Sequence, residues 1–153
     1  MSIQSVRAFF AEKAPDIAVV ELDVPTSTVE LAAQAHGVAP AQIAKTLSLR
    51  VGSRVFLVVM RGDARLDNKK AKAAFGGKVS MLGPEEVEAV TGHPVGGVCP
   101  FGLKTPLPVY CDVSLKDFEE VVPAAGSVYS AVRIKPARIV ELAGADWVDV
   151  ARL

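Results

Sequence analysis

Residues 45–60 read KTLSLRVGSRVFLVVM, and this stretch decides the fold class. Its first seven residues alternate, which predicts a strand with the apolar side chains and Lys45 on one face. The opposite face carries Thr46, Ser48 and Arg50 and is expected to meet solvent. Gly52 and Ser53 then separate this strand from VFLVVM, a continuous apolar run typical of a strand covered on both faces. The short gap predicts an antiparallel hairpin.

Lys45 is unusual because it shares a face with leucine and valine side chains. An ammonium beside an apolar face costs desolvation free energy unless an anionic or polar group meets it. One interpretation is a charge that faces a ligand. The other is a lysine at the first residue of the strand whose ammonium simply reaches water. Spacing alone leaves both open.

Start and stop signals predict helices and strands around the hairpin. The expected helices are residues 5–13, 27–37 (opened by a capping box, Ser27 to Glu30), 67–75, 84–92 and 136–143, with a helical turn at 40. Besides the hairpin, the expected strands are 17–24, 109–113, 129–134 and 147–150. The chain has no internal repeat or linker, so we expect one domain over residues 1–153, of the α+β class, with a mixed sheet and peripheral helices.

Composition limits the function classes. The 17 basic and 17 acidic residues cancel, so any contact with nucleic acid must be local. Cys99 and Cys111 form no CxxC pair, and neither a metal site nor a disulfide framework is indicated. No run approaches the roughly 18 apolar residues of a membrane span. We expect a soluble, cytoplasmic protein with no metal and no membrane partner.

The segment TGHPVGGVCPFG, residues 91–102, has four glycines and two prolines in twelve residues. Glycines let main-chain N–H groups approach a ligand, and prolines restrict the flanking dihedrals. Both a functional loop and a tight structural crossover fit this composition. His93 within it could be a general base or a hydrogen-bonding residue.

A second small-residue segment, AAGSVYS, spans residues 124–130. Ser127 or Ser130 could be a nucleophile, but no Asp–His relay or GxSxG elbow accompanies them. Hydrogen bonding to a ligand, or turn formation, is the better interpretation. Basic residues at 61–78 form either a solvated helix face or a local patch for a few phosphates.

Three segments together resemble the YbaK / prolyl-tRNA synthetase-associated editing domain family: AKTL (44–47), GDARLDNKK (62–70) and TGHPVGGVCPFG. The resemblance extends from about Pro25 to Ile139, and the Gly-Gly-x-x-Pro-x-Gly loop makes it specific. It implies a mixed, partly barrel-like sheet surrounded by helices. It also implies a free-standing trans-editing enzyme that hydrolyses the ester of mischarged aminoacyl-tRNA without a metal or organic cofactor. The implied partners are the acceptor end of that tRNA and an aminoacyl-tRNA synthetase.

The resemblance makes Lys45 the catalytic residue and places Gly96 and Gly97 at the cavity for the aminoacyl-adenosine end. We expect Lys45 to position the substrate at its phosphate or 3′ adenosine rather than act as a base. The alternative is that Lys45 stabilises the developing oxyanion, with the N–H groups of Gly96 and Gly97 as further donors. The residues expected to bind substrate are Thr26, Thr46, His93, Gly96, Gly97, Gly126, Ser127 and Ser130.

The chain also departs from the family pattern. Ser130 and its neighbours stand where cysteine editors tend to carry an Asp, and Cys99 stands where many members place Ser. The resemblance therefore implies a small amino acid such as Ala, Ser, Thr or Cys. The alternative from another class is a module that binds aminoacyl-tRNA or an aminoacyl-nucleotide without turnover.

Overall fold

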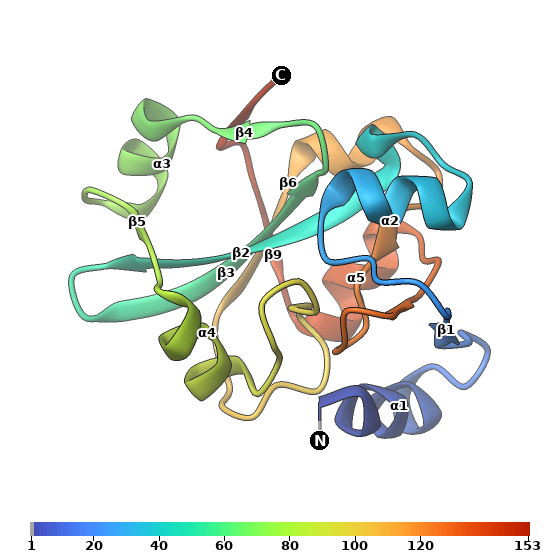
Figure 1. Ribbon diagram of the computed structural model, residues 1–153. Coiled ribbons are helices and arrows are strands. Elements are labelled where there is room, and N and C mark those ends of the chain that lie inside the picture. Colours follow the sequence, from blue (N-terminus) through green and yellow to red (C-terminus); the bar gives the residue numbers. More distant parts are fainter. Residues whose placement is uncertain (1) are drawn as a thin grey trace.

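The computed structural model describes residues 2–153 and has a mixed sheet at its centre (Figure 1). The sheet has the order β5-β2-β3-β6-β9, with β7 also paired to β2. Pairing is antiparallel for β2–β3 and β2–β5, and parallel for β2–β7, β3–β6 and β6–β9. The bounds are β2 Ile43–Val51, β3 Arg54–Arg61, β5 Ser80–Met81, β6 Val109–Asp112, β7 Val122–Pro123 and β9 Asp146–Val148. This confirms the α+β class with a mixed sheet, and the sheet is open rather than a closed barrel.

The β2–β3 hairpin is the longest pairing in the sheet and confirms the predicted hairpin. Its register sets Lys45 opposite Met60 and Val51 opposite Arg54. β2 begins at Ile43, two residues before the predicted start, because β7 adds a parallel rung there.

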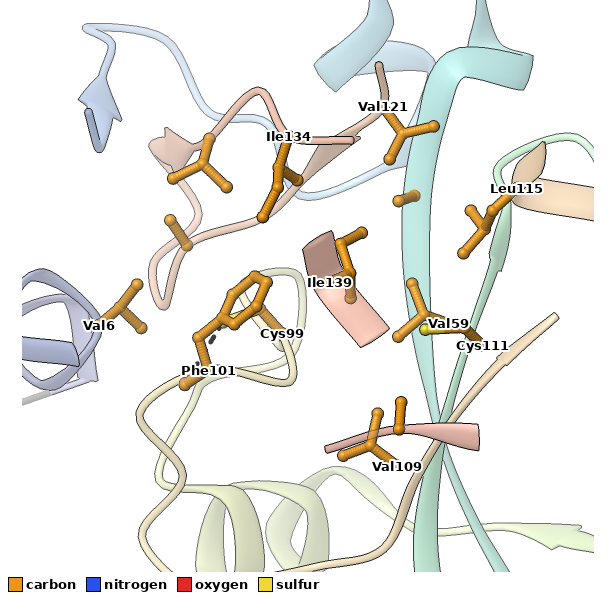
Figure 2. Close-up of a cluster of buried hydrophobic side chains, with 14 of the residues drawn as sticks. Val6, Val59, Cys99, Phe101, Val109, Cys111, Leu115, Val121, Ile134 and Ile139 are labelled. Carbon is orange, nitrogen blue, oxygen red and sulfur yellow. Dashed lines mark hydrogen bonds between the residues drawn. The ribbon is translucent and has the colours of Figure 1, made fainter. Parts of the chain in front are cut away.

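Helices cover both faces of the sheet. Leu57 and Val59 of β3 face a cluster that includes α1 (Ser2–Lys13), α5 (Pro136–Ala143) and the loop around Phe101. Figure 2 shows part of this cluster, with Phe101, Ile139 and Val59 pointing toward one another. Phe56 and Val58 face the other cluster, which α3 (Asn68–Phe75) closes. Burial on both faces explains why β3 is a continuous apolar run.

Local capping explains where the helices begin and end. Asp67 accepts a hydrogen bond from the Lys70 amide at 3.0 Å and opens α3, as predicted. α4 (Pro84–Thr91) and α5 both have a proline in the first turn and end at a left-handed glycine. α2 (Val29–His36) is capped by Thr28 instead of Ser27, so the predicted capping box was wrong.

The predicted strands outside the hairpin differ most from the structure in their lengths. The strands predicted at 17–24 and 129–134 shrink to β1 (Val20–Glu21) and β8 (Ser130–Ala131), which pair with each other. β5, β7, β4 (Arg65–Leu66) and β10 (Ala151–Arg152) were not predicted, because two residues carry no readable alternation. The short helices are η1 (Pro40–Gln42) and η2 (Val113–Asp117). Within residues 2–153, no helix has the length and apolar character to cross a membrane.

Candidate functional site

A cavity of about 300 Å³ opens along the outer edge of β2. α2 lies near the start of that strand, and β5 and α4 lie toward its end (Figure 1). Apolar side chains make most of the wall, and hydroxyl groups and one lysine interrupt it. The lining residues are Thr26–Val29, Ala32, Ile43–Thr46, Ser48, Met81, Leu82, Pro84, Val87, Val95, Gly96, Val98, Val122, Ala124, Ser130 and Ala131.

The cavity occupies a break in the pairing of the sheet. β7 pairs with β2 at Ile43 and Ala44, and β5 pairs with it again at Leu49 and Arg50. Neither strand covers the outer edge of β2 between these two contacts. Residues from both faces of β2 therefore border the cavity there.

Thr46 and Ser48 line the cavity, so the expectation that their face of β2 meets solvent was wrong. Ser48 is only 4% exposed. Arg50, the third residue of that face, forms an ion pair with Glu86 of α4. Alternation in a sequence distinguishes a polar strand face from an apolar one. It does not distinguish a polar face that lines a cavity from a polar face that meets solvent.

Lys45 borders the cavity and is half-buried. Its Nζ atom donates a hydrogen bond to the main-chain oxygen of Ala64 at 2.5 Å. Burial lowers the pKa of Lys45, while the carboxylates of Asp63 and Glu30 act in the opposite direction. Asp63 is itself held by Arg61, through contacts of 2.6 and 2.7 Å. The Lys45 side chain is therefore tied to the turn after β3 and does not simply extend into water.

The two loop glycines have different positions. Gly96 lines the cavity with φ of 91°, and a Cβ there would lie 2.9 Å from Cβ of Ser27. Gly97 lies behind it, where a Cβ would meet the main chain of Ser127 at 2.8 Å. The N–H of Gly97 donates to the oxygen of Pro94 at 2.9 Å, so it is not the free ligand donor that we expected.

The serine segment contributes one side chain to the cavity. Ser130 is fully buried and lines it, and its Oγ lies 2.8 Å from Oγ of Ser127, which does not. Thr26 also lines the cavity, but its hydroxyl donates to the oxygen of Val128 at 2.9 Å. Gly126 packs against α1, where a Cβ would lie 2.7 Å from the oxygen of Ser2.

His93 lies away from the cavity and is fully buried. Its Nε2 atom is 2.8 Å from the oxygen of Phe101 and 3.6 Å from Sγ of Cys99. Burial lowers the pKa of His93 and raises the pKa of Cys99 to about 12. These two groups contact each other and the Phe101 main chain within the loop, and neither lines the cavity.

The lining, all of it within the described residues, contains no carboxylate and no imidazole. Its hydroxyl groups therefore have no carboxylate or imidazole beside them to act as a general base. Among residues 2–153, no cluster of three His, Cys, Asp or Glu side chains could hold a metal. The arrangement can bind and orient a small polar molecule and polarise it with one cation.

Most of the apolar wall was not predicted. Among the polar members, the alternation of β2 predicts a solvent-facing Ser48, and the residues around Thr28 predict only the start of a helix. The apolar members come from α2, β2, the segment from β5 into α4, the glycine loop, the segment from β7 to Ala124, and β8, and most of them have the pattern of ordinary core residues. Only the short pairings that leave the edge of β2 open could have identified them, and two-residue strands give no such signal.

Known proteins resemble this chain in sequence and in overall fold. A family model described as the aminoacyl-tRNA editing domain matches residues 23–142. The chain belongs to this family. The matched range includes the whole cavity lining.

Individual relatives cover nearly the whole chain or most of it. The uncharacterized protein YwhH of Bacillus subtilis is 46% identical, over 99% of this chain and 98% of that protein. EbsC of Enterococcus faecalis, described as a proposed Cys-tRNA(Pro)/Cys-tRNA(Cys) deacylase, is 30% identical over 80% of this chain and 76% of its own. A solved structure of a proposed trans-editing enzyme for prolyl tRNA synthetase is 35% identical, with a TM-score of 0.91 over 99% of this chain and 98% of that one.

Proposed function

We propose that residues 1–153 form one editing domain that hydrolyses the ester of mischarged aminoacyl-tRNA carrying a small amino acid, such as Ala, Ser, Thr or Cys. The observation that carries the proposal is the cavity at the break in the sheet, with Lys45 at its border. A volume of about 300 Å³ suits an aminoacyl group with part of the terminal ribose, and the apolar wall suits a small side chain. Membership of the aminoacyl-tRNA editing domain family supports the same substrate class.

The mouth of the cavity suits the 3′ end of a tRNA. Met81 and Val95 line it and are 61% and 56% exposed, so they offer apolar surface to a nucleobase. Lys45 keeps an ammonium at the border, where it can hold the terminal phosphate or the ribose. One local cation agrees with a chain of zero formal net charge. A synthetase that charges the tRNA is the proposed second partner.

Water is the proposed nucleophile unless the substrate supplies its own. The water oxygen bonds to the ester carbonyl carbon, and the bond from that carbon to the ribose oxygen breaks. The ribose oxygen takes one proton of that water and leaves as a hydroxyl, and the amino acid leaves as a carboxylate while the other proton passes to solvent. The protein contributes orientation and polarisation of the carbonyl, which need no protein nucleophile.

Deacylation of a panel of charged tRNAs tests the proposal. Wild type should release amino acid from at least one of Ala-, Ser-, Thr- or Cys-tRNA, and Lys45→Ala should lose most of that activity. Release no faster than in buffer for every tRNA would contradict the proposal. Saturable binding without release would instead indicate a module that binds aminoacyl-tRNA without turnover.

A further inference from the structure

Thr46 directs its main-chain N–H and C=O groups to the open part of the outer edge of β2. The amide of Leu82 donates to the oxygen of Ser48 at 3.0 Å, so the main chain of Ser48 points to the outer edge of β2. The N–H and C=O groups of alternate residues in a strand point to the same edge, so those of Ala44 and Thr46 point there too. Ala44 pairs with β7, but Thr46 faces the break between β7 and β5.

The side chain of Thr46 adds the third atom. Its Oγ1 is buried and has no hydrogen-bond partner within residues 2–153, and the residue lines the cavity. Buried main-chain groups and hydroxyls are nearly always paired, because an unpaired one loses its bonds to water. The main-chain donor and acceptor of Thr46 are thus directed toward a ligand that supplies the missing rung of the sheet, with the buried hydroxyl beside them.

We propose that an aminoacyl group fills this break and forms an antiparallel bridge with Thr46, which rests on the proposed function. Two residues directly opposite each other in antiparallel strands exchange both main-chain hydrogen bonds. In an extended conformation, the carbonyl oxygen of the ester accepts from the Thr46 N–H, and the α-ammonium donates to the Thr46 oxygen. The same N–H then stabilises negative charge that develops on the carbonyl oxygen.

This bridge determines where the substrate side chain lies. Opposite residues in an antiparallel pair place their side chains on the same face, with Cβ atoms about 4.5–5.5 Å apart. The side chain therefore lies beside Oγ1 of Thr46 and the apolar wall. The bridge also favours a free α-amine: α-hydroxyacyl and N-acylated esters, including peptidyl-tRNA, replace the charged ammonium donor with a neutral O–H or N–H.

Binding of non-hydrolysable adenosine derivatives tests the bridge. The probes are 3′-aminoacylamino-3′-deoxyadenosines carrying alanyl, seryl or threonyl groups, each with its α-hydroxyacyl and N-acetyl counterparts, measured by calorimetry. We expect the counterparts of the tightest probe to bind about 5- to 15-fold more weakly, because a neutral donor replaces a charged one in the bond to the Thr46 oxygen. Equal affinities within about threefold, or no binding of any probe, would overturn the bridge.

Variants and an amide signal separate the main-chain bridge from side-chain effects. Thr46→Val removes only the hydroxyl and should keep the preference for a free α-amine. In ¹⁵N spectra, saturation with the tightest probe should slow hydrogen exchange of the Thr46 amide by about 10-fold or more. The Leu47 amide, which points toward β3, should not change. An unprotected Thr46 amide in the complex would overturn the bridge.

The two proposals fail in different ways. Discrimination between the amine and hydroxyl probes, without hydrolysis of any charged tRNA, would support the bridge and contradict the hydrolase. Hydrolysis of aminoacyl- and α-hydroxyacyl-tRNA at equal rates would support the hydrolase and overturn the bridge.

Discussion

The ammonium of Lys45 and the main-chain oxygen of Ala64 lie 2.5 Å apart and join the start of β2 to the turn after β3. Ala64 is fully buried, so this acceptor is fixed by the core. The contact satisfies one of three ammonium hydrogens and leaves the cation at the border of the cavity. The position of the Lys45 ammonium is therefore set by the fold of the turn that contains Ala64, although the lysine side chain itself is flexible.

Replacing Lys45 with methionine tests the positioning role. The variant keeps the apolar stem and removes the charge, so kcat/KM for the preferred charged tRNA should fall about 10- to 100-fold. If Lys45 holds a phosphate, the slope of log KM against log salt should also lose about 0.7, one single-strand phosphate contact. Lys13→Met, on the exposed end of α1, is the control and should change neither quantity. An unchanged salt slope together with a reduced kcat would indicate that Lys45 acts on the ester carbonyl and does not bind a phosphate.

The contact between the glycine loop and the serine segment predicts a second result. In Gly97→Ser the new Cβ meets the Ser127 main chain at 2.8 Å, which a side-chain rotation cannot relieve. We expect a loss of about 1–3 kcal/mol in unfolding free energy, together with reduced deacylation. Gly83→Ser is the matched control, because no atom lies within 4 Å of its Cβ and serine suits a helix N-cap. If urea titrations give the two variants the same unfolding free energy, the glycine loop can shift away from the Ser127 main chain at little cost, which contradicts this prediction.

Substitutions of the hydrogen-bonded pair Ser127 and Ser130 should distinguish an effect on substrate selectivity from an effect on stability. Ser130→Ala removes a hydroxyl from the cavity and should change the ratio of kcat/KM between Ser-tRNA and Ala-tRNA by about 3- to 10-fold. Ser127→Ala removes the partner hydroxyl and its bond to the Tyr129 amide, both outside the cavity. That variant should lower stability and leave the ratio near wild type. A change of the ratio in Ser127→Ala alone would reverse these assignments.

The elements that could be predicted are those with a strong local signal. α5 runs from Pro136 to Ala143 as expected, because a first-turn proline and Gly144 bound it. The hairpin was also confirmed, because alternation in β2 is followed by the continuous apolar run of β3. These signals lie within one stretch of chain and need no tertiary information.

The cavity depends on contacts between distant segments, and this is why the rest could not be predicted. The sequence pattern of Thr46 and Ser48 predicts a solvent-exposed strand face. These residues line a cavity instead because β7 and β5 pair with β2 on either side of them. His93 looks available until the loop folds over it and Phe101 accepts its ring N–H. Burial of a polar residue is decided by the elements that cover it, and for Thr46 these include β7 and β8, about 80 residues further along the chain.

The buried imidazole of His93 predicts how stability depends on pH. Burial lowers its pKa below the ordinary 6.5, so at acidic pH the unfolded chain binds a proton that the native state does not. Unfolding should therefore become easier as pH falls below about 6.5, by up to about 1.4 kcal/mol per pH unit for this group. Above that pH both states are neutral at His93 and the effect vanishes. Urea titrations between about pH 5 and 7.5 measure it, above the range where most carboxylates titrate.

His93→Gln is the control for this pH effect, since its amide can still donate to the Phe101 oxygen but does not titrate. The variant should lose some stability at neutral pH and show a shallower decline toward pH 5. His36 also has a lowered pKa, mainly from burial and further from Arg133, so part of the decline should remain until His36→Gln is added. A double variant with the wild-type pH slope would mean that neither imidazole is kept neutral by the fold.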